Sequence, residues 1–192
     1  MVNYPLKPNK IILSYFINDI HNAAEANGFP LPNLIMRPKP YISFFIEKSY
    51  FLNYVYWKLY RLLVYRPLRS LLRGSNTIYE DYLRKVYTNE VVLSAHKKEL
   101  LNIITFAHQI EADILFLLWP NLRVIDETKY ITDKMEKFLR ENNVDFINLA
   151  TYFQGRKGLD LVNNSTDAHP NTKVHLEVAD LLYKKLASHS SK

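Results

Sequence analysis

A short polar stretch near the carboxyl end of the chain, Asp167-Ala168-His169-Pro170-Asn171, places an acid and an imidazole two residues apart. A carboxylate beside a histidine orients the ring and fixes its tautomer, as a general base requires. Pro170 restricts the backbone of His169 to extended conformations, which helps to aim the ring. A structural alternative stays open, because the same stretch is a polar turn suited to capping a following helix.

The segments that would position these groups can be predicted from the hydrophobic pattern. Three continuous apolar runs predict strands at 11–17, 113–119 and 144–149. Continuous rather than alternating runs are typical of parallel strands covered on both faces. Helical patterns cover 94–111, 128–142 and 174–187. Because strand and helix alternate through the second half, the sequence predicts an α/β domain with a parallel sheet.

In such sheets the functional side chains lie just beyond the carboxyl ends of the strands. Asn18 follows the first run, Asn121 follows the second, and the Asp167–His169 loop precedes the last helix. We therefore expect Asn18, Asn121, Asp167 and His169 at one crevice, and His21 is a further residue that could line it.

The other histidines receive structural assignments. His96 and His108 lie on the predicted helix 94–111 and are expected at the surface. His175 is expected to pack or cap at the start of the last helix. No group of His, Asp or Glu has the spacing of metal ligands, so no metal is expected.

Composition narrows the classes of function. The length suits a single domain over residues 1–192, and the lack of cysteine excludes disulfides, thiolate zinc sites and cysteine nucleophiles. The net charge of +6 comes with no nucleic-acid-binding motif, so no nucleic-acid partner is expected. There is no signal-peptide pattern and no apolar run of the roughly 18 residues that span a bilayer. A cytoplasmic or membrane-peripheral protein is expected if Met1 is the true start.

Two segments resemble sequence blocks of the SGNH hydrolases, the GDSL esterase and lipase superfamily. "SYFINDI", residues 14–20, is similar to the block usually written Gly-x-Asn-Asp, with Asn18 at the oxyanion-hole asparagine. "DAHPNTKVHLEVA", residues 167–179, is similar to the last block, with Asp167 and His169 at the catalytic acid and base. The resemblance is strongest over 8–20 and 112–187. It implies a three-layer, flavodoxin-like fold and hydrolysis of a small-molecule or lipid ester without a cofactor.

The chain departs from the family pattern most at the nucleophile. The Gly-Asp-Ser block and the block with the oxyanion glycine are both absent, and Phe16 and Val174 replace two other glycines. About ten residues precede the asparagine block, too few for a strand, a crossover helix and a second strand. We therefore expect the N-terminal strands of the fold to be missing. No nucleophile is identified, since Ser14 is expected to face the core and Ser165 belongs to the Asp167 loop.

The resemblance is weak over 29–93, where a basic, aromatic helical insert is expected at about 40–93. Residues 48–73 contain six basic residues and no acidic one. Leu52, Tyr56, Leu59 and Leu63 share a helical face, and Pro67 limits the segment to two helices. Three roles stay open: packing on the domain with snorkelling arginines, binding an anionic membrane surface, or covering an acyl site.

The sequence is consistent with two functions. The first is an SGNH-type ester hydrolase that acts on an acyl or acetyl ester, with this chain by itself inactive. The second is a non-catalytic SGNH-like remnant or a membrane-surface interaction module. Without the preceding strands, residues 11–17 would form an exposed apolar edge, which predicts self-association.

Overall fold

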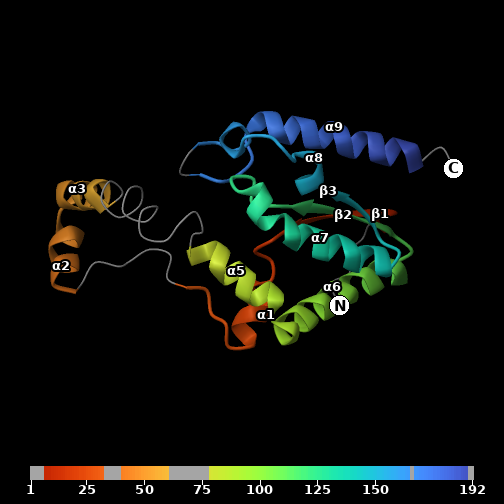
Figure 1. Cartoon of the computed structure of the whole chain (residues 1–192), viewed down its shortest axis with the longest axis horizontal. Helices are drawn as coiled ribbons and strands as arrows, with labels where there is room; N and C mark the ends of the chain where they lie inside the picture. The colour runs from red at the N-terminus through yellow and green to blue at the C-terminus, as the bar shows by residue number, and fades with distance from the viewer. Residues whose placement is uncertain (1–6, 33–39, 61–77, 165–166, 190–192) are drawn as a thin grey trace.

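The fold is built around a parallel sheet of three strands, seen in a computed structural model that describes residues 7–32, 40–60, 78–164 and 167–189 (Figure 1). The strands are β1 (Lys10–Phe16), β2 (Asp113–Trp119) and β3 (Asp145–Asn148), in the order β1-β2-β3. Ser14 pairs with Leu117, and Leu117 pairs with Ile147. The predicted α/β class, the parallel sheet and the three strand positions are confirmed.

Helices connect and cover the strands. Their bounds are α1 (His21–Ala26), α2 (Pro40–Lys48), α3 (Tyr50–Tyr60), α5 (Ile78–Thr88), α6 (Glu90–Gln109), α7 (Ile125–Glu141), α8 (Leu149–Tyr152) and α9 (Thr172–His189), with a short 3₁₀ helix at Gly158–Asp160. The three predicted helices correspond to α6, α7 and α9. Helix α6 begins earlier than predicted because the Asn89 side chain accepts the backbone N–H groups of Val91 and Val92.

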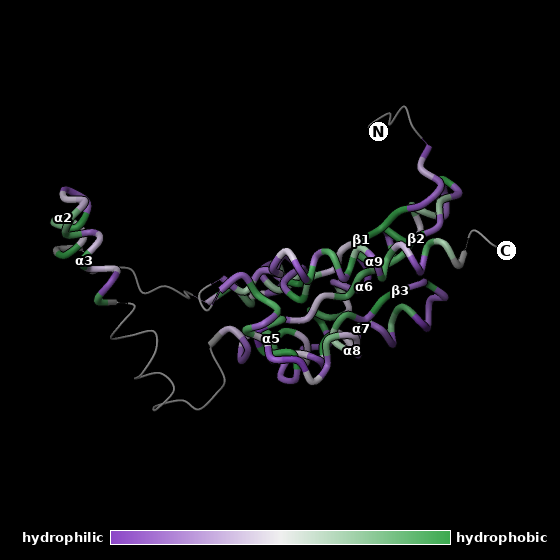
Figure 2. Tube along the Cα trace, turned by 90° about the horizontal axis from the view of Figure 1, so that it is seen from above, coloured by the Kyte–Doolittle hydropathy of each residue, from purple (hydrophilic) through white to green (hydrophobic). Residues whose placement is uncertain are grey.

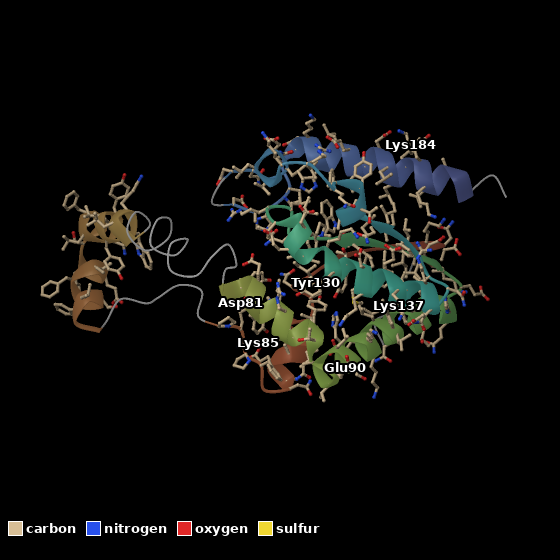
Figure 3. The ribbon with its side chains drawn as sticks, in the orientation of Figure 1. Asp81, Lys85, Glu90, Tyr130, Lys137 and Lys184 are labelled. Atoms are coloured by element: carbon tan, nitrogen blue, oxygen red, sulfur yellow. The ribbon has the colours of Figure 1, made fainter. Side chains whose placement is uncertain are left out.

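Charges near the helix ends match the helix dipoles. Helix α5 carries Asp81 in its first turn and Lys85 in its last, and α6 opens with Glu90 (Figure 3). Acidic side chains near the amino end and basic ones near the carboxyl end each stabilise a helix by about 0.3–1 kcal/mol. These charges therefore help to define the ends of α5 and the start of α6, which lie in the region 29–93 where the family resemblance is weak.

One face of the sheet is covered by α5, α6 and α7. Tyr15, Phe116 and Leu118 point into this layer and are fully buried. The helices meet them with apolar side chains, which include Leu83, Val86, Leu100, Ile104, Ile131 and Met135. Residues 78–93, which were predicted to belong to the insert at about 40–93, thus contribute to the core of the α/β body.

The other face is covered by α8 and α9, and this cover is incomplete. Leu117 and Trp119 of β2 pack with Phe153, Val174 and Val178. On the same face of the edge strand β1, Ile12 and Phe16 are 43% and 37% exposed, and Ser14 is also exposed. The prediction that Ser14 faces the core was wrong, because no described helix covers this part of β1.

His96 is buried, so its prediction as a surface residue was wrong. It is one of the buried residues of α6, together with Val92, Leu100 and Ile104. The His96 Nε2 lies 3.0 Å from the Tyr15 hydroxyl, which lies 2.6 Å from the Tyr87 hydroxyl. Tyr87 in turn donates to the Ile17 carbonyl at 3.0 Å. This buried network of Tyr15, Tyr87 and His96 joins β1, α5 and α6.

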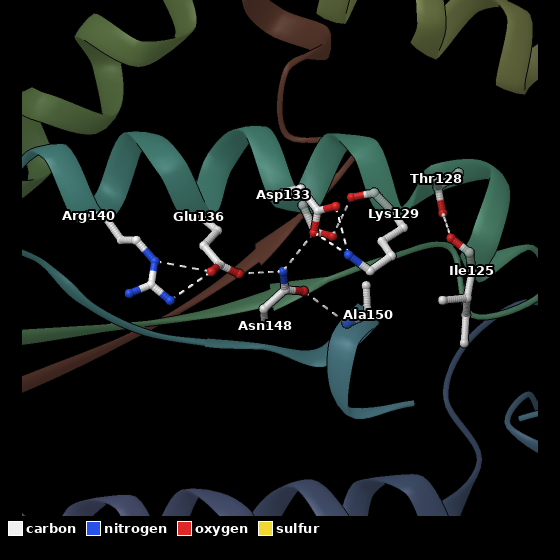
Figure 4. Close-up of polar contacts among 9 residues, drawn as sticks. Ile125, Thr128, Lys129, Asp133, Glu136, Arg140, Asn148 and Ala150 are labelled. Carbon is white, nitrogen blue, oxygen red and sulfur yellow. Dashed lines mark hydrogen bonds and ion pairs between the residues drawn. The ribbon is translucent and has the colours of Figure 1, made fainter. Parts of the chain in front are cut away.

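A second polar cluster fixes the end of β3 (Figure 4). The buried Asn148 side chain donates to Glu136 at 2.8 Å and accepts the Ala150 N–H at 3.1 Å, which caps α8. Arg140 donates to the same Glu136 carboxylate at 2.8 Å. Burial alone would raise the pKa of Glu136, but the hydrogen bonds from Asn148 and Arg140 hold it below its usual value. The cluster ties β3 to α7 and sets the direction in which the chain leaves the sheet.

Helices α2 and α3 pack on each other (Figures 1 and 2). Neither hydrophobic cluster of the α/β body includes a residue from 40–60. The expected helical face at Leu52, Tyr56 and Leu59 lies on α3, whereas Leu63 and Pro67 lie outside the described residues. Among the described helices, none is long and apolar enough to cross a membrane.

Candidate functional site

The loop that carries Asp167 and His169 is held at both ends. Asn171 donates its backbone N–H to the Leu161 carbonyl at 3.0 Å and its side-chain amide to the Asp160 carbonyl at 2.8 Å. Its side-chain oxygen also accepts the Val174 N–H at 3.0 Å, at the start of α9. The helix-capping role expected as an alternative for this stretch is therefore carried by Asn171 and not by Asp167 or His169.

Asp167 and His169 form a close pair. The Nδ1 atom of His169 lies 2.6 Å from an Asp167 oxygen, and the His169 backbone N–H donates to the same oxygen at 3.0 Å. The Asn163 amide donates to the second oxygen at 3.0 Å. The backbone N–H of His169, then the Asn163 amide and the His169 ring lower the pKa of Asp167 to about 2.

This pairing decides which nitrogen of His169 can act as a base. An ionised carboxylate only accepts hydrogen bonds, so the Nδ1 atom carries the proton that it donates to Asp167. The Nε2 atom of the neutral ring is then the acceptor. The His169 side chain is 84% exposed, so Nε2 is open to a ligand.

His169 lines a pocket at the carboxyl ends of β1 and β2. The pocket has a volume of about 160 Å³ and is lined by Phe16, Ile17, Asn18, Tyr79, Trp119, Pro120, Asn121, Leu122, Ala168, His169 and Pro170. Asn18 thus shares a pocket with His169, as expected from the strand order. The Asn18 side-chain amide makes no hydrogen bond with the described residues and remains an available donor.

Phe16 and Trp119 form the apolar wall of the pocket. Their rings stack at 5.6 Å with an interplanar angle of 7°. The backbone N–H of Phe16 donates to Asp19 at 2.9 Å and is therefore not free to stabilise an oxyanion. The buried indole Nε1 of Trp119 has no hydrogen-bond partner among the described residues.

Asn121 also lines the pocket, as predicted, but its side chain has two intramolecular bonds. Its amide donates to Glu80 of α5 at 3.3 Å, and its oxygen accepts the Arg123 N–H at 3.2 Å. These bonds fix the turn that follows β2. Asn121 therefore shapes the pocket, whereas Asn18 is the residue with an unused donor.

The sequence did not indicate Tyr79, which provides the one hydroxyl among the described residues that line the pocket. Burial first, then nearby Glu80, raises the pKa of Tyr79 above its ordinary value. The hydroxyl lies 3.3 Å from Nε2 of His21, so His21 contacts the pocket through Tyr79. A phenol that resists ionisation is a hydrogen-bond donor rather than a nucleophile.

The serines considered from the sequence do not supply a nucleophile here. Ser14 is exposed on β1 but does not line the pocket, and Ser165 lies outside the described residues. His175, expected at the start of α9, is exposed there, with its ring 6.2 Å from that of Trp119. The described part of the site thus offers a base and a hydrogen-bond donor without an activated hydroxyl.

A second cavity, of about 180 Å³, lies at the opposite end of the sheet. Its charged side chains are engaged with one another, since Lys10 lies 3.6 Å from Asp113 and Lys185 lies 3.5 Å from Asp145. In parallel sheets the functional groups gather at the carboxyl ends of the strands. The pocket with His169 is therefore the better candidate, although the other cavity is slightly larger.

Comparisons with family models, curated proteins and solved structures found no match to the chain. No cluster of three or more His, Asp or Glu side chains arranged for a metal ion is found in the described ranges.

Proposed function

We propose that the pocket at the carboxyl ends of β1 and β2 belongs to an ester-hydrolysing centre of the SGNH type, which acts on an acyl or acetyl ester. The observation that carries the proposal is the Asp167–His169 pair, which shares one pocket with the free amide of Asn18. The resemblance of 14–20 and 167–179 to the family's blocks assigns the same three residues.

Each residue has one role in the proposed reaction. His169 takes the proton from an attacking hydroxyl at Nε2, and the oxygen then attacks the ester carbonyl carbon. Asp167 holds the ring and stabilises the imidazolium that forms. The Asn18 amide donates to the oxyanion, which collapses and expels the alcohol as His169 returns the proton. A water molecule deprotonated by His169 then attacks the acyl group left on the hydroxyl oxygen, which releases the acid and restores the hydroxyl.

The hydroxyl has to come from a residue outside the described wall of the pocket. Among the described strands β1 lies at the edge of the sheet, which leaves one side open to pairing with a further parallel strand. The end of such a strand would lie beside Asn18, at the same carboxyl edge of the sheet. In the flavodoxin-like order, β1 takes the place of strand 3, and strand 1 of that order lies on this side.

A non-catalytic SGNH-like module is the second candidate. Two observations favour it. Among the described residues that line the pocket, the one hydroxyl is that of Tyr79, which is not a nucleophile. The Phe16 N–H donates to Asp19 and is not available to an oxyanion. In that case the pocket binds a ligand without turning it over.

An added alcohol distinguishes the two functions, because it replaces the absent hydroxyl. We expect the chain to accelerate acyl transfer from 4-nitrophenyl acetate to ethanol, followed as ethyl acetate formed. His169→Ala should lower this ethanol-dependent rate by on the order of 10²-fold, the lower range for a positioned general base. Asn18→Ala should also lower it strongly, since loss of one oxyanion donor costs about 10²–10³ in rate.

The matched control is His108→Ala, which removes an exposed histidine of α6 that lines the cavity at the other end of the sheet. This variant should keep the full transfer rate. Transfer that persists in both His169→Ala and Asn18→Ala, or no ethanol-dependent transfer by the folded chain, would favour the non-catalytic module.

A further inference from the structure

Helices α2 and α3 expose an unusual density of large apolar side chains. The described chain has 18 such exposed residues, and seven lie on these two helices: Phe44, Phe45, Tyr50, Phe51, Leu52, Tyr54 and Leu59. Tyr50 is 99% exposed and Phe51 is 72% exposed. Side chains project outward from both helices in Figure 3, and apolar and polar residues alternate along them in Figure 2.

The pair of helices, residues 40–60, has little core of its own. Ile46 is its one fully buried hydrophobic side chain among the described residues. Helix α3 starts at a local cap, where the Ser49 hydroxyl accepts the Leu52 N–H at 3.3 Å. Isolated helices of nine and eleven residues are marginally stable in water. Burying the exposed aromatic side chains against another surface would therefore stabilise the helix pair.

The net charge in and around the helix pair indicates the kind of partner that would cover its apolar side chains. Residues 37–73 contain eight of the 25 basic residues and one of the 19 acidic residues, which leaves 17 basic and 18 acidic elsewhere. The whole net positive charge of the chain therefore comes from this segment. The described helices carry exposed Lys48 and Lys58 against one exposed acid, Glu47, and the other six basic residues lie in the flanking 37–39 and 61–73. The Lys58 ammonium lies 5.4 Å from the centre of the Tyr54 ring.

We propose that the helix pair α2–α3 binds the headgroup surface of an anionic lipid bilayer. Tyr, Trp and Phe side chains favour the boundary between headgroups and acyl chains, and lysines beside them attract anionic lipids. The nine and eleven residues of α2 and α3 are too few to cross a bilayer, which requires about 20. The helices therefore lie in the interface. The proposal does not depend on the ester-hydrolysing function.

The test is sedimentation of the full chain with vesicles of phosphatidylcholine, with and without phosphatidylglycerol. We expect binding only to the anionic vesicles, with a loss of binding at high salt. Lys48→Ala and Lys58→Ala should each weaken binding about fivefold, because a basic residue near an anionic surface contributes about 1 kcal/mol. Brominated lipids should quench Trp57 on α3 upon binding.

The apolar contribution is tested with the double variant Phe45→Ser/Phe51→Ser. Both side chains are exposed, at 64% and 72%, so the fold should be unaffected. We expect at least a tenfold loss of vesicle binding. The matched control is Phe106→Ser/Leu176→Ser, which removes two exposed apolar side chains from α6 and α9 and should bind vesicles as the wild type does.

Three results would overturn the proposal. The first is equal binding to both kinds of vesicle, or no binding to either. The second is self-association without lipid that Phe45→Ser/Phe51→Ser abolishes, which would make a second copy the occupant. The third is a loss of ester transfer in that variant with vesicle binding unchanged, which would make the helices a cover for the ester site.

Discussion

Two histidine networks of this molecule use similar groups in opposite surroundings. His169 bonds to Asp167 on an exposed loop, and its Nε2 opens on a pocket. His96 lies near the Tyr15 hydroxyl in the core, where Tyr87 continues the network to the Ile17 carbonyl. The difference teaches that a hydrogen-bonded histidine marks a chemical site only where a ligand can reach it. In the core the same bonds join secondary-structure elements.

The largest effect that separates the two networks is expected from Asp167→Asn. With asparagine at this position no carboxylate holds Nδ1–H, and the amide can instead donate to Nδ1, so Nε2 is not kept as the basic nitrogen. We expect the ethanol-dependent acyl transfer to fall by on the order of 10²-fold, as far as with His169→Ala. The free energy of unfolding at neutral pH should fall by less than with a lost buried hydroxyl, because the pair lies at the surface, although the carboxylate's hydrogen bonds in the folded chain are lost.

The measurement is the transfer rate beside urea unfolding of the same preparation. An unchanged transfer rate in a folded Asp167→Asn chain would remove Asp167 from the site. It would also show that the exposed pair resembles the buried one in being structural.

Tyr87→Phe should have the reverse pattern. It removes the hydroxyl that bonds Tyr15 and donates to the Ile17 carbonyl, and leaves buried polar groups unsatisfied. We expect a loss of about 1–3 kcal/mol in the free energy of unfolding, measured with urea. The ethanol-dependent transfer rate should be retained under conditions where the chain is folded. Tyr183→Phe, at a tyrosine that is 72% exposed, is the control and should unfold as the wild type does; equal stability of the two variants would contradict the role of the network.

The smallest effect concerns pH. Burial lowers the pKa of His96 below its ordinary value, although Glu99 and Asp19 act against it. Below about pH 6.5 the unfolded chain therefore binds a proton that the folded chain does not, and stability falls as the pH falls. The slope for one such group is at most about 1.4 kcal/mol per pH unit. Above pH 6.5 this contribution is constant.

His96→Gln should flatten the loss of stability between pH 7.5 and pH 5.5, measured by urea unfolding at each pH. Burial lowers the pKa of His21 as well, so His21→Gln is the comparison for the remaining slope. The pKa of Asp19 is raised in the folded chain, so its protonation increases stability as the pH falls, opposite to the histidines. Each variant is therefore compared with the wild type at each pH. A slope that His96→Gln leaves unchanged would assign the pH dependence to other groups.

Local sequence determined the framework of the α/β body. The apolar runs at 11–17 and 113–119 predicted strands that lie within one residue of β1 and β2, because burial on both faces requires continuous apolar residues. The adjacency of Asp167 and His169 predicted a bonded pair, because two residues of extended loop bring the side chains together. The strand order then indicated that Asn18 and His169 would line one pocket, and they do.

Only the tertiary structure decided which groups of this framework are accessible. Ser14 is exposed because no described helix covers this part of β1, and no periodicity within the strand reports which side of the sheet is covered. Tyr79 enters the pocket from α5, a segment far from Asn18 and His169 in the sequence. His96 was a nearer miss, since the spacing of Val92, His96, Leu100 and Ile104 already placed it on the buried side of α6. Sequence periodicity gives the face of an element, but the elements packed against that face determine whether it is buried.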